Sequence, residues 1–252
     1  MMATNHLFKY VLSLGDDSLI IAQRLSEWAY KAPYLEEDIA LSNISLDMFG
    51  RANMFLEYAA LIKGNNSIAD DLAFKRSERE FTNRLIYEQP NGDFAKTMAR
   101  QFFLDAYNKL FLEQLINSAD SQLSAIAQKS IKETNYHIRH SSSWILRLGD
   151  GTSASHMKVQ SAINDIWTFT GELFEMTENE KEMEKKKIGV DYPGLKSNWD
   201  KIVNDIFKEA TLSRPKDEHM RIGGRQGIHT EHLGHMLSDM QYLQRAYPDA
   251  KW

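Results

Sequence analysis

Proline is rare in this chain, and its absence over long segments limits the possible folds more than any other feature. The chain has 252 residues and five prolines. They are Pro33, Pro90, Pro193, Pro215 and Pro248. A proline interrupts the hydrogen bonding of a helix, so the long proline-free segments between them can each be helical. Short Gly- and Asn-containing turns separate these segments, which predicts helices joined by turns.

Apolar residues recur at helical spacing in two of the long segments. One stripe comprises Leu41, Ile44, Met48, Ala52, Phe55, Ala59 and Ile62. A second comprises Leu123, Ala127, Ile131, Thr134, Ile138, Ile145 and Leu148. Residues three and four apart share one face of a helix, whereas no alternating pattern of useful length predicts a strand. The sequence therefore predicts an all-α fold.

The predicted helices cover most of the chain. We expect them over residues 6–29, 36–63, 67–87, 94–118, 121–148, 155–176, 195–212 and 228–246, with the charged run 178–187 as a solvated helix end. Four of them have the length of a four-helix bundle, roughly 35–40 Å. We therefore expect one domain over 1–252, a four-helix bundle with additional C-terminal helices. Its core bundle would span about 6–148 with helices to 176, and a C-terminal helical part would span about 195–252.

Composition excludes several classes of protein. The 30 Lys and Arg against 35 Asp and Glu give a formal net charge of −5, which argues against nucleic-acid binding. The absence of cysteine excludes disulfides, thiolate zinc sites and iron–sulfur clusters. Residues 1–17 have no signal-peptide pattern, and the apolar run 19–22 is too short to span a membrane. We expect a cytoplasmic protein.

A bundle with interior carboxylates suggests a di-metal site, which requires Glu-x-x-His motifs on two of its helices. Neither Glu-x-x-His nor Asp-x-x-His occurs in this sequence. Asp47 has Gly50 where the histidine would stand, and Arg51 follows one helical turn after Asp47. Arg51 can therefore pair with Asp47 and supply the positive charge that a metal would bring.

The second candidate position is equally incomplete. Glu133 has Tyr136 in the histidine slot, while His137 and His140 follow on a stripe of their own. This stripe is either a general-base pair or degenerate metal site, or a hydrogen-bonded histidine network that ties helices together. The second interpretation is favoured. We expect no metal in this chain and a structural polar network of Asp47, Arg51, Glu133, His137 and His140.

Other carboxylates of the long helices are less informative. Asp16 and Asp17 could be buried carboxylates, although a charge near the start of a helix is the plainer role for both. Glu27, Asp105 and Glu113 are compatible with either an interior or a surface position.

A glycine-rich segment near the C-terminus is a candidate contact site. Backbone N–H groups of its Gly223–Gly224 turn, beside arginine side chains, could receive a phosphate. The alternative is a loop that docks against the bundle or against a partner chain. The candidate residues are Arg221, Gly223, Gly224, Arg225, His229, Glu231 and His232.

Several longer motifs carry a family resemblance that spans nearly the whole chain. They are LGDDSL at 14–19, QRLSEW at 23–28, LEEDIALSN at 35–43, KE with YHIRH at 132–140, LGDGT at 148–152, GIHTEHLG at 227–234 and MQYLQRAYP at 240–248. With these motifs the chain resembles the C subunits of bacterial phenylacetyl-CoA ring 1,2-epoxidases, which are phenylacetate-degradation proteins.

The resemblance implies a structural subunit with a ferritin-like bundle and no metal of its own. It implies pairing with a catalytic A subunit that holds a di-iron centre and binds phenylacetyl-CoA. A reductase with NADPH, flavin and iron–sulfur groups would supply electrons. The glycine-rich segment would then contact CoA or a partner, and the isolated chain could form a homodimer. No residue matches the catalytic pattern. The alternative is a di-metal oxygenase, or a metal-binding bundle, with atypical ligands drawn from Asp47, Glu133 and His137.

Overall fold

A computed structural model of the protein describes residues 2–248 and 250, and none of these residues lies in a strand. The predicted all-α class is confirmed. Within the same residues, no helix combines the length and the apolar character that a membrane crossing requires. The chain divides into two compact units, of which unit 1 comprises Met1–Pro90 and Gly223–Trp252 and unit 2 comprises Asn91–Ile222. The single domain over 1–252 stays a prediction.

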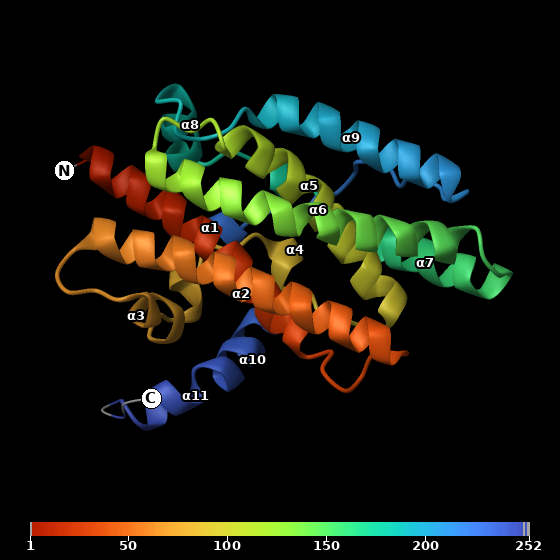
Figure 1. Ribbon diagram of the computed structural model, residues 1–252, viewed down its shortest axis with the longest axis horizontal. Helices are drawn as coiled ribbons and strands as arrows, with labels where there is room; N and C mark the ends of the chain where they lie inside the picture. Colours follow the sequence, from red (N-terminus) through yellow and green to blue (C-terminus); the bar gives the residue numbers. More distant parts are fainter. Residues whose placement is uncertain (1, 249, 251–252) are drawn as a thin grey trace. The chain divides into compact units, whose positions relative to one another are not determined.

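Unit 1 is built around a hairpin of two long helices that lie side by side (Figure 1). Its elements are α1 (Met2–Ser26), α2 (Leu35–Lys63), α3 (Ala69–Phe74), η1 (Glu78–Glu80), α4 (Leu85–Glu88), η3 (Gly224–Gln226), α10 (Glu231–Met240) and α11 (Tyr242–Ala246). Gly15 allows α1 to approach α2 closely, because a Cβ atom there would lie 2.7 Å from Leu56 Cδ2.

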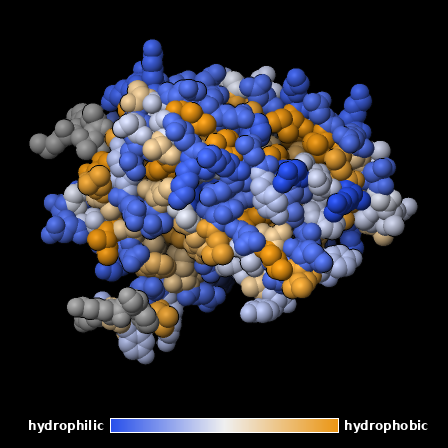
Figure 2. Space-filling view, viewed as in Figure 1, coloured by the Kyte–Doolittle hydropathy of each residue, from blue (hydrophilic) through white to orange (hydrophobic). Residues whose placement is uncertain are grey.

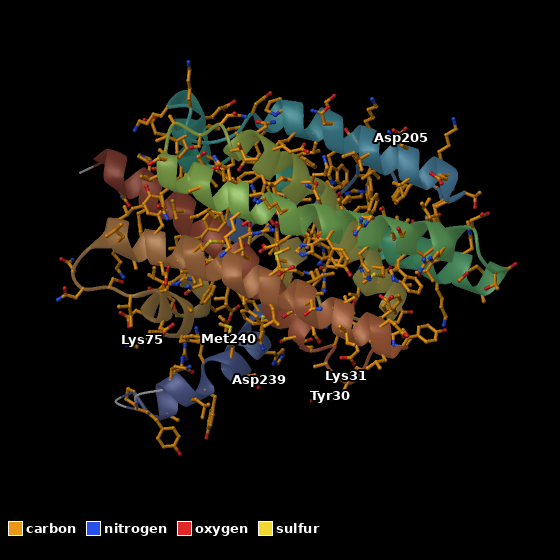
Figure 3. The ribbon with its side chains drawn as sticks, in the orientation of Figure 1. Tyr30, Lys31, Lys75, Asp205, Asp239 and Met240 are labelled. Atoms are coloured by element: carbon orange, nitrogen blue, oxygen red, sulfur yellow. The ribbon has the colours of Figure 1, made fainter. Side chains whose placement is uncertain are left out.

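The apolar stripe of α2 forms its buried face, as the spacing predicts. Leu41, Ile44, Met48, Ala52, Phe55 and Ala59 are buried, and Ile62 is half-buried. The turn before α2 places Tyr30 in a left-handed conformation with φ 66°, and its side chain is 99% exposed. Tyr30 and Lys31 extend away from the helices (Figure 3).

Unit 2 contains the second long hairpin and shorter helices that cover it. Its elements are α5 (Phe94–Leu115), α6 (Ser121–Gly149), α7 (Ser153–Trp167), η2 (Gly171–Phe174), α8 (Glu178–Lys185) and α9 (Tyr192–Glu209). Asp93 and Asp120 cap α5 and α6, because their carboxylates accept hydrogen bonds from backbone N–H groups of the first turn. The core packs Phe103, Trp167 and Trp199 with ring centroids 5.5–5.8 Å apart.

The buried face of α6 differs from the predicted stripe. Ile131, Ile138 and Leu148 are only half-buried. The buried side chains are Leu123, Ile126, Ala127, Ser130, Thr134, His137, Ser141 and Ile145. The small hydroxyl side chains can be buried because carbonyls of the same helix accept their hydrogen bonds. Thr134 Oγ1 donates to the Ser130 carbonyl (3.0 Å), and Ser141 Oγ donates to the His137 carbonyl (3.1 Å).

The predicted helix over 67–87 is wrong. Only α3, η1 and α4 form there, and the chain between them is extended. The reason lies in the backbone donors: Thr82 N–H donates to Asp16 Oδ2 (2.9 Å) and Arg84 N–H donates to Asp17 Oδ1 (2.8 Å). These groups bond to carboxylates of α1 and are not available for an intrahelical ladder.

Two further predicted helices are shorter than expected. The helix over 155–176 ends at Trp167 because the Thr168 carbonyl accepts from Arg221 N–H (2.8 Å), and the run 178–187 forms the separate helix α8. The helix over 228–246 begins only at Glu231 and breaks at Gln241. The Gln241 amide donates to the carbonyls of Ala73 (3.2 Å) and Arg76 (3.0 Å).

Candidate functional site

The two degenerate metal positions lie on different helices in different units. Asp47 and Arg51 lie one turn apart on α2 of unit 1, and Arg51 is 3% exposed. Glu133, His137 and His140 lie on α6 of unit 2, where His137 is buried and the other two are half-buried. In residues 2–248 and 250, no group of three or more His, Asp or Glu side chains could hold a metal ion. The polar network through these five residues stays a prediction.

A cluster of buried charges is the most elaborate polar site of unit 1. Asp16 lies in the middle of α1 and is fully buried. Both of its oxygens accept hydrogen bonds from the Arg76 guanidinium, and Oδ2 also accepts from the Thr82 hydroxyl (3.0 Å). A bidentate arginine–carboxylate pair is among the strongest charge-assisted hydrogen-bond arrangements. It fastens α1 to the extended segment that follows α3.

Asp17 binds two further arginines. Its carboxylate accepts from Arg84 Nη1 (3.1 Å), from Arg225 Nη1 (3.0 Å) and from Arg225 Nη2 (2.6 Å). Arg225 Nη1 also donates to the main-chain carbonyl of Ser13 (3.2 Å). Since Arg225 follows Arg84 by well over a hundred residues, Asp17 joins three distant parts of the sequence.

Glu88 collects four donors in the same unit. They are Asn83 Nδ2 (2.9 Å), Thr230 N (2.6 Å), Thr230 Oγ1 (2.8 Å) and His229 Nδ1 (2.8 Å). The side chains of both Glu88 and His229 are fully buried. Arg24 donates to the Glu88 main-chain carbonyl (3.0 and 2.9 Å) and to that of His232 (3.1 Å). The segment after residue 223 is thus bound to both α1 and α4.

The neighbours of His229 favour its protonated form and raise its pKa. Burial alone lowers its pKa, but the hydrogen bond and the negative charge of Glu88 outweigh burial, so the net effect is a raised pKa. The Phe81 carbonyl, 2.9 Å from Nε2, and the charge of Glu78 act in the same direction. A carbonyl and a carboxylate both accept hydrogen bonds, so a doubly protonated ring satisfies both contacts.

The glycine-rich segment lies against protein. A Cβ atom on Gly224 would lie 2.2 Å from the Asn83 carbonyl oxygen, so only glycine fits this approach. Gly223 has φ 141°, a conformation that side chains rarely adopt. Both glycines are buried.

The remaining candidate contact residues differ in exposure. Glu231 is exposed and His232 half-buried. Arg221 belongs to unit 2, where its exposed guanidinium lies 5.5 Å from the centre of the Phe169 ring. Contact of these residues with CoA or with a partner stays a prediction.

The position of Asp16 and Asp17 corrects an expectation. They are not charges near the start of a helix, because α1 begins at Met2 and both are buried in its middle. One signal was present: two adjacent acids lie between the apolar residues of 10–14 and the apolar run 19–22. An acid that is buried among such residues requires a charged or hydrogen-bonding partner.

These observations define an all-α protein of helical hairpins with a buried carboxylate–arginine cluster. Comparison with known proteins then gives the family. The family model described as Phenylacetic acid catabolic protein matches residues 1–252, and the chain belongs to this family, whose fold is ferritin-like. It is 49% identical over 248 residues to the C subunit of the 1,2-phenylacetyl-CoA epoxidase of Escherichia coli (strain K12). The match covers 98% of this chain and 100% of that relative.

Proposed function

We propose that this chain is the structural, non-catalytic subunit of a phenylacetyl-CoA epoxidase that acts in aerobic phenylacetate catabolism in the cytoplasm. In this role it pairs with a catalytic subunit that holds the di-iron centre and the substrate. A separate reductase, with NADPH, flavin and iron–sulfur groups, delivers the electrons. The full-length similarity to the C subunit of an epoxidase supports the assignment to such a complex.

The observation that carries the non-catalytic role is how the buried carboxylates of unit 1 are used. Asp16 binds Arg76, Asp17 binds Arg84 and Arg225, and Glu88 binds four donors from neighbouring residues. Guanidinium, N–H and O–H donors occupy the oxygens of these three carboxylates, which are then not available as metal ligands. This donor set suits a rigid scaffold that holds a partner in its active geometry.

In this proposal the buried carboxylates position parts of the chain and take no part in catalysis. Hydrogen bonds of the three carboxylates join α1, the segment 76–88 and the C-terminal segment within unit 1. A rigid surface lowers the entropy that is lost when a partner docks, since little of it must become ordered on binding.

The metal content of the purified chain, reconstituted anaerobically with ferrous iron, tests the proposal. We expect near-zero iron by mass spectrometry, and co-purification with the catalytic subunit. We also expect that Glu133→Ala leaves the turnover of the assembled complex close to that of the wild type. About two irons per chain, bound by Asp47, Glu133 and His137, would instead make the chain an oxygenase in its own right.

A further inference from the structure

The outward face of α2 carries a line of large apolar side chains that nothing in the described chain covers. Leu35, Ile39, Leu46 and Leu61 are 73%, 53%, 65% and 77% exposed. At about 100° per residue they fall within a sector of about 80° on the helix. Hydrophobic residues come to the surface among hydrophilic ones along the course of α2 (Figure 2). Asn43, Asn53 and Glu57 are exposed in the same sector, so this face combines apolar and polar side chains, as protein interaction surfaces do.

Gly50 lies in the same sector, between Leu46 and Leu61. A Cβ atom built on it meets nothing within 4 Å, and its backbone is ordinary helix. The fold of this chain therefore does not require a glycine there, and glycine weakens a helix interior relative to alanine. A bare position in the middle of an exposed apolar line lets the backbone of a second helix approach closely.

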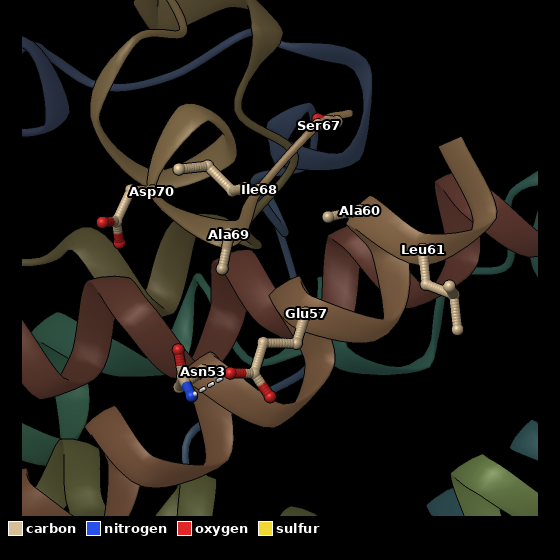
Figure 4. Close-up of a pocket in the computed structure, with 8 residues that line it drawn as sticks. All are labelled: Asn53, Glu57, Ala60, Leu61, Ser67, Ile68, Ala69 and Asp70. Atoms are coloured by element: carbon tan, nitrogen blue, oxygen red, sulfur yellow. Dashed lines mark hydrogen bonds between the residues drawn. The ribbon is translucent and has the colours of Figure 1, made fainter. Parts of the chain in front are cut away.

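A groove adjoins this line along the second half of α2. Asn53, Glu57, Ala60, Leu61, Ser67, Ile68, Ala69 and Asp70 line an open cavity of about 520 Å³ between α2 and α3 (Figure 4). Leu61 and Ile68 are exposed apolar side chains of its wall. Asn53 Nδ2 donates to Glu57 Oε1 (3.0 Å), and no described Lys or Arg forms an ion pair with Glu57 or Asp70.

The exposed charges along this face are mostly acidic. The acidic residues of α2 are Glu36, Glu37, Asp38, Asp47 and Glu57, and its basic residues are Arg51 and Lys63. Arg51 is buried and Lys63 is exposed, so acidic residues outnumber the exposed basic one on the helix. Asp70 adds a further negative charge at the groove, where the charge of Lys75 partly offsets it. Two copies of such a face would repel each other, whereas a partner with basic flanks is attracted.

We propose that the outward face of α2, together with the groove at Ile68 and Asp70, docks a helix of the catalytic partner that has an apolar ridge and basic flanking residues. This inference rests on the proposed function. The apolar ridge lies along Leu35, Ile39, Leu46 and Leu61, and the partner backbone passes Gly50. Basic side chains of the partner reach Glu57 and Asp70 in the groove.

The first test is a graded series at Gly50, measured as the Kd between the full-length chain and the catalytic subunit of the epoxidase. Gly50→Leu fills the bare position, and we expect it to raise Kd roughly tenfold or more. Gly50→Ala adds one methyl group and should raise Kd much less. Both variants should melt at or above the wild-type temperature because a helix-favouring residue replaces glycine. Lys201→Leu, on the exposed side of α9, is the matched control.

The second test addresses charge. The double variant Glu57→Lys, Asp70→Lys should raise the Kd of the complex and reduce the dependence of its association rate on ionic strength. The variant should fold normally because both positions are exposed. Adding lysine at two exposed acidic positions elsewhere, Asp205→Lys with Glu209→Lys on α9, is the control and should leave the Kd unchanged.

The outcomes separate this inference from the proposed function. If the wild-type chain and the catalytic subunit form no complex, the proposed function fails. If they form a complex and Gly50→Leu with the charge reversals bind as tightly as the wild type, the α2 face is not the docking surface. Dissolution of a homodimer by Gly50→Leu, with the complex unaffected, would make the face a contact between two copies and would also overturn the inference.

Discussion

His229 Nδ1 lies 2.8 Å from Glu88 Oε2, and both side chains are fully buried. On the other side of the ring, His229 Nε2 lies 2.9 Å from the Phe81 carbonyl oxygen. Both neighbours are acceptors, so this contact links the protonation of one histidine to the attachment of the C-terminal segment. Thr230, the next residue, donates twice to the same carboxylate.

The stability of unit 1 should therefore depend on pH through His229. Its pKa is raised above 6.5 in the folded chain, chiefly because the contact with Glu88 outweighs burial. A raised folded pKa means that the stabilisation is complete below the unfolded value, near 6.5, and is lost as pH rises through the folded value. We expect the wild type to exceed His229→Gln in free energy of unfolding at about pH 6, by a margin that shrinks toward pH 9.

Urea unfolding across this range measures the effect, with His235→Gln as the control because His235 is exposed on α10. The control should track the wild type at every pH. A constant difference between wild type and His229→Gln would show that His229 stabilises the fold by packing and not by its charge.

Removing the carboxylate of Asp17 should destabilise the fold strongly. Asp17→Ala deprives two buried guanidinium groups, those of Arg84 and Arg225, of this counter-charge. Breaking a buried ion pair from one side typically costs about 3–5 kcal/mol. The free energy of unfolding in urea measures this cost. The exposed Asp205 on α9 gives the control Asp205→Ala, which should stay within about 0.5 kcal/mol of the wild type. Equal effects of the two substitutions would contradict a structural role for the cluster.

The sequence could not predict this cluster for a physical reason. Asp16, Arg76 and Arg225 lie far apart along the chain, and helical spacing reports only neighbours three or four residues away. The same long-range bonds explain why no helix forms over 67–87: the carboxylates of α1 take the backbone donors of Thr82 and Arg84. The helix predicted over 36–63 is α2, Leu35–Lys63, because one periodic apolar face determines where this helix forms.

Substitution of Gly224 tests how tightly the C-terminal segment packs against the backbone around Arg84. A Cβ atom there would lie 2.2 Å from a backbone oxygen and 3.0 Å from Arg84 Cα, so Gly224→Ala must displace backbone. We expect about 1–3 kcal/mol of destabilisation and faster hydrogen exchange in residues 223–240. Gly50→Ala, where nothing lies within 4 Å, is the control and should be neutral or stabilise by about 0.5–1 kcal/mol. Unchanged exchange in Gly224→Ala would mean that the segment is held loosely.

The candidate network of Asp47 and Arg51 can be tested by a double-mutant cycle. Arg51 is 3% exposed, and Asp47 lies one helical turn before it. A guanidinium buried to this degree requires a counter-charge or several acceptors, so Arg51→Ala should lower stability by about 3–5 kcal/mol. If Asp47 is its main partner, Asp47→Ala and the double variant will show a coupling of about 0.5–3 kcal/mol in thermal or urea unfolding. Strictly additive effects would show that Asp47 and Arg51 do not interact. Wild-type stability of Arg51→Ala would contradict a stabilising polar network at this position. Coupling of this size would show that Asp47 is the counter-charge of the buried Arg51 guanidinium.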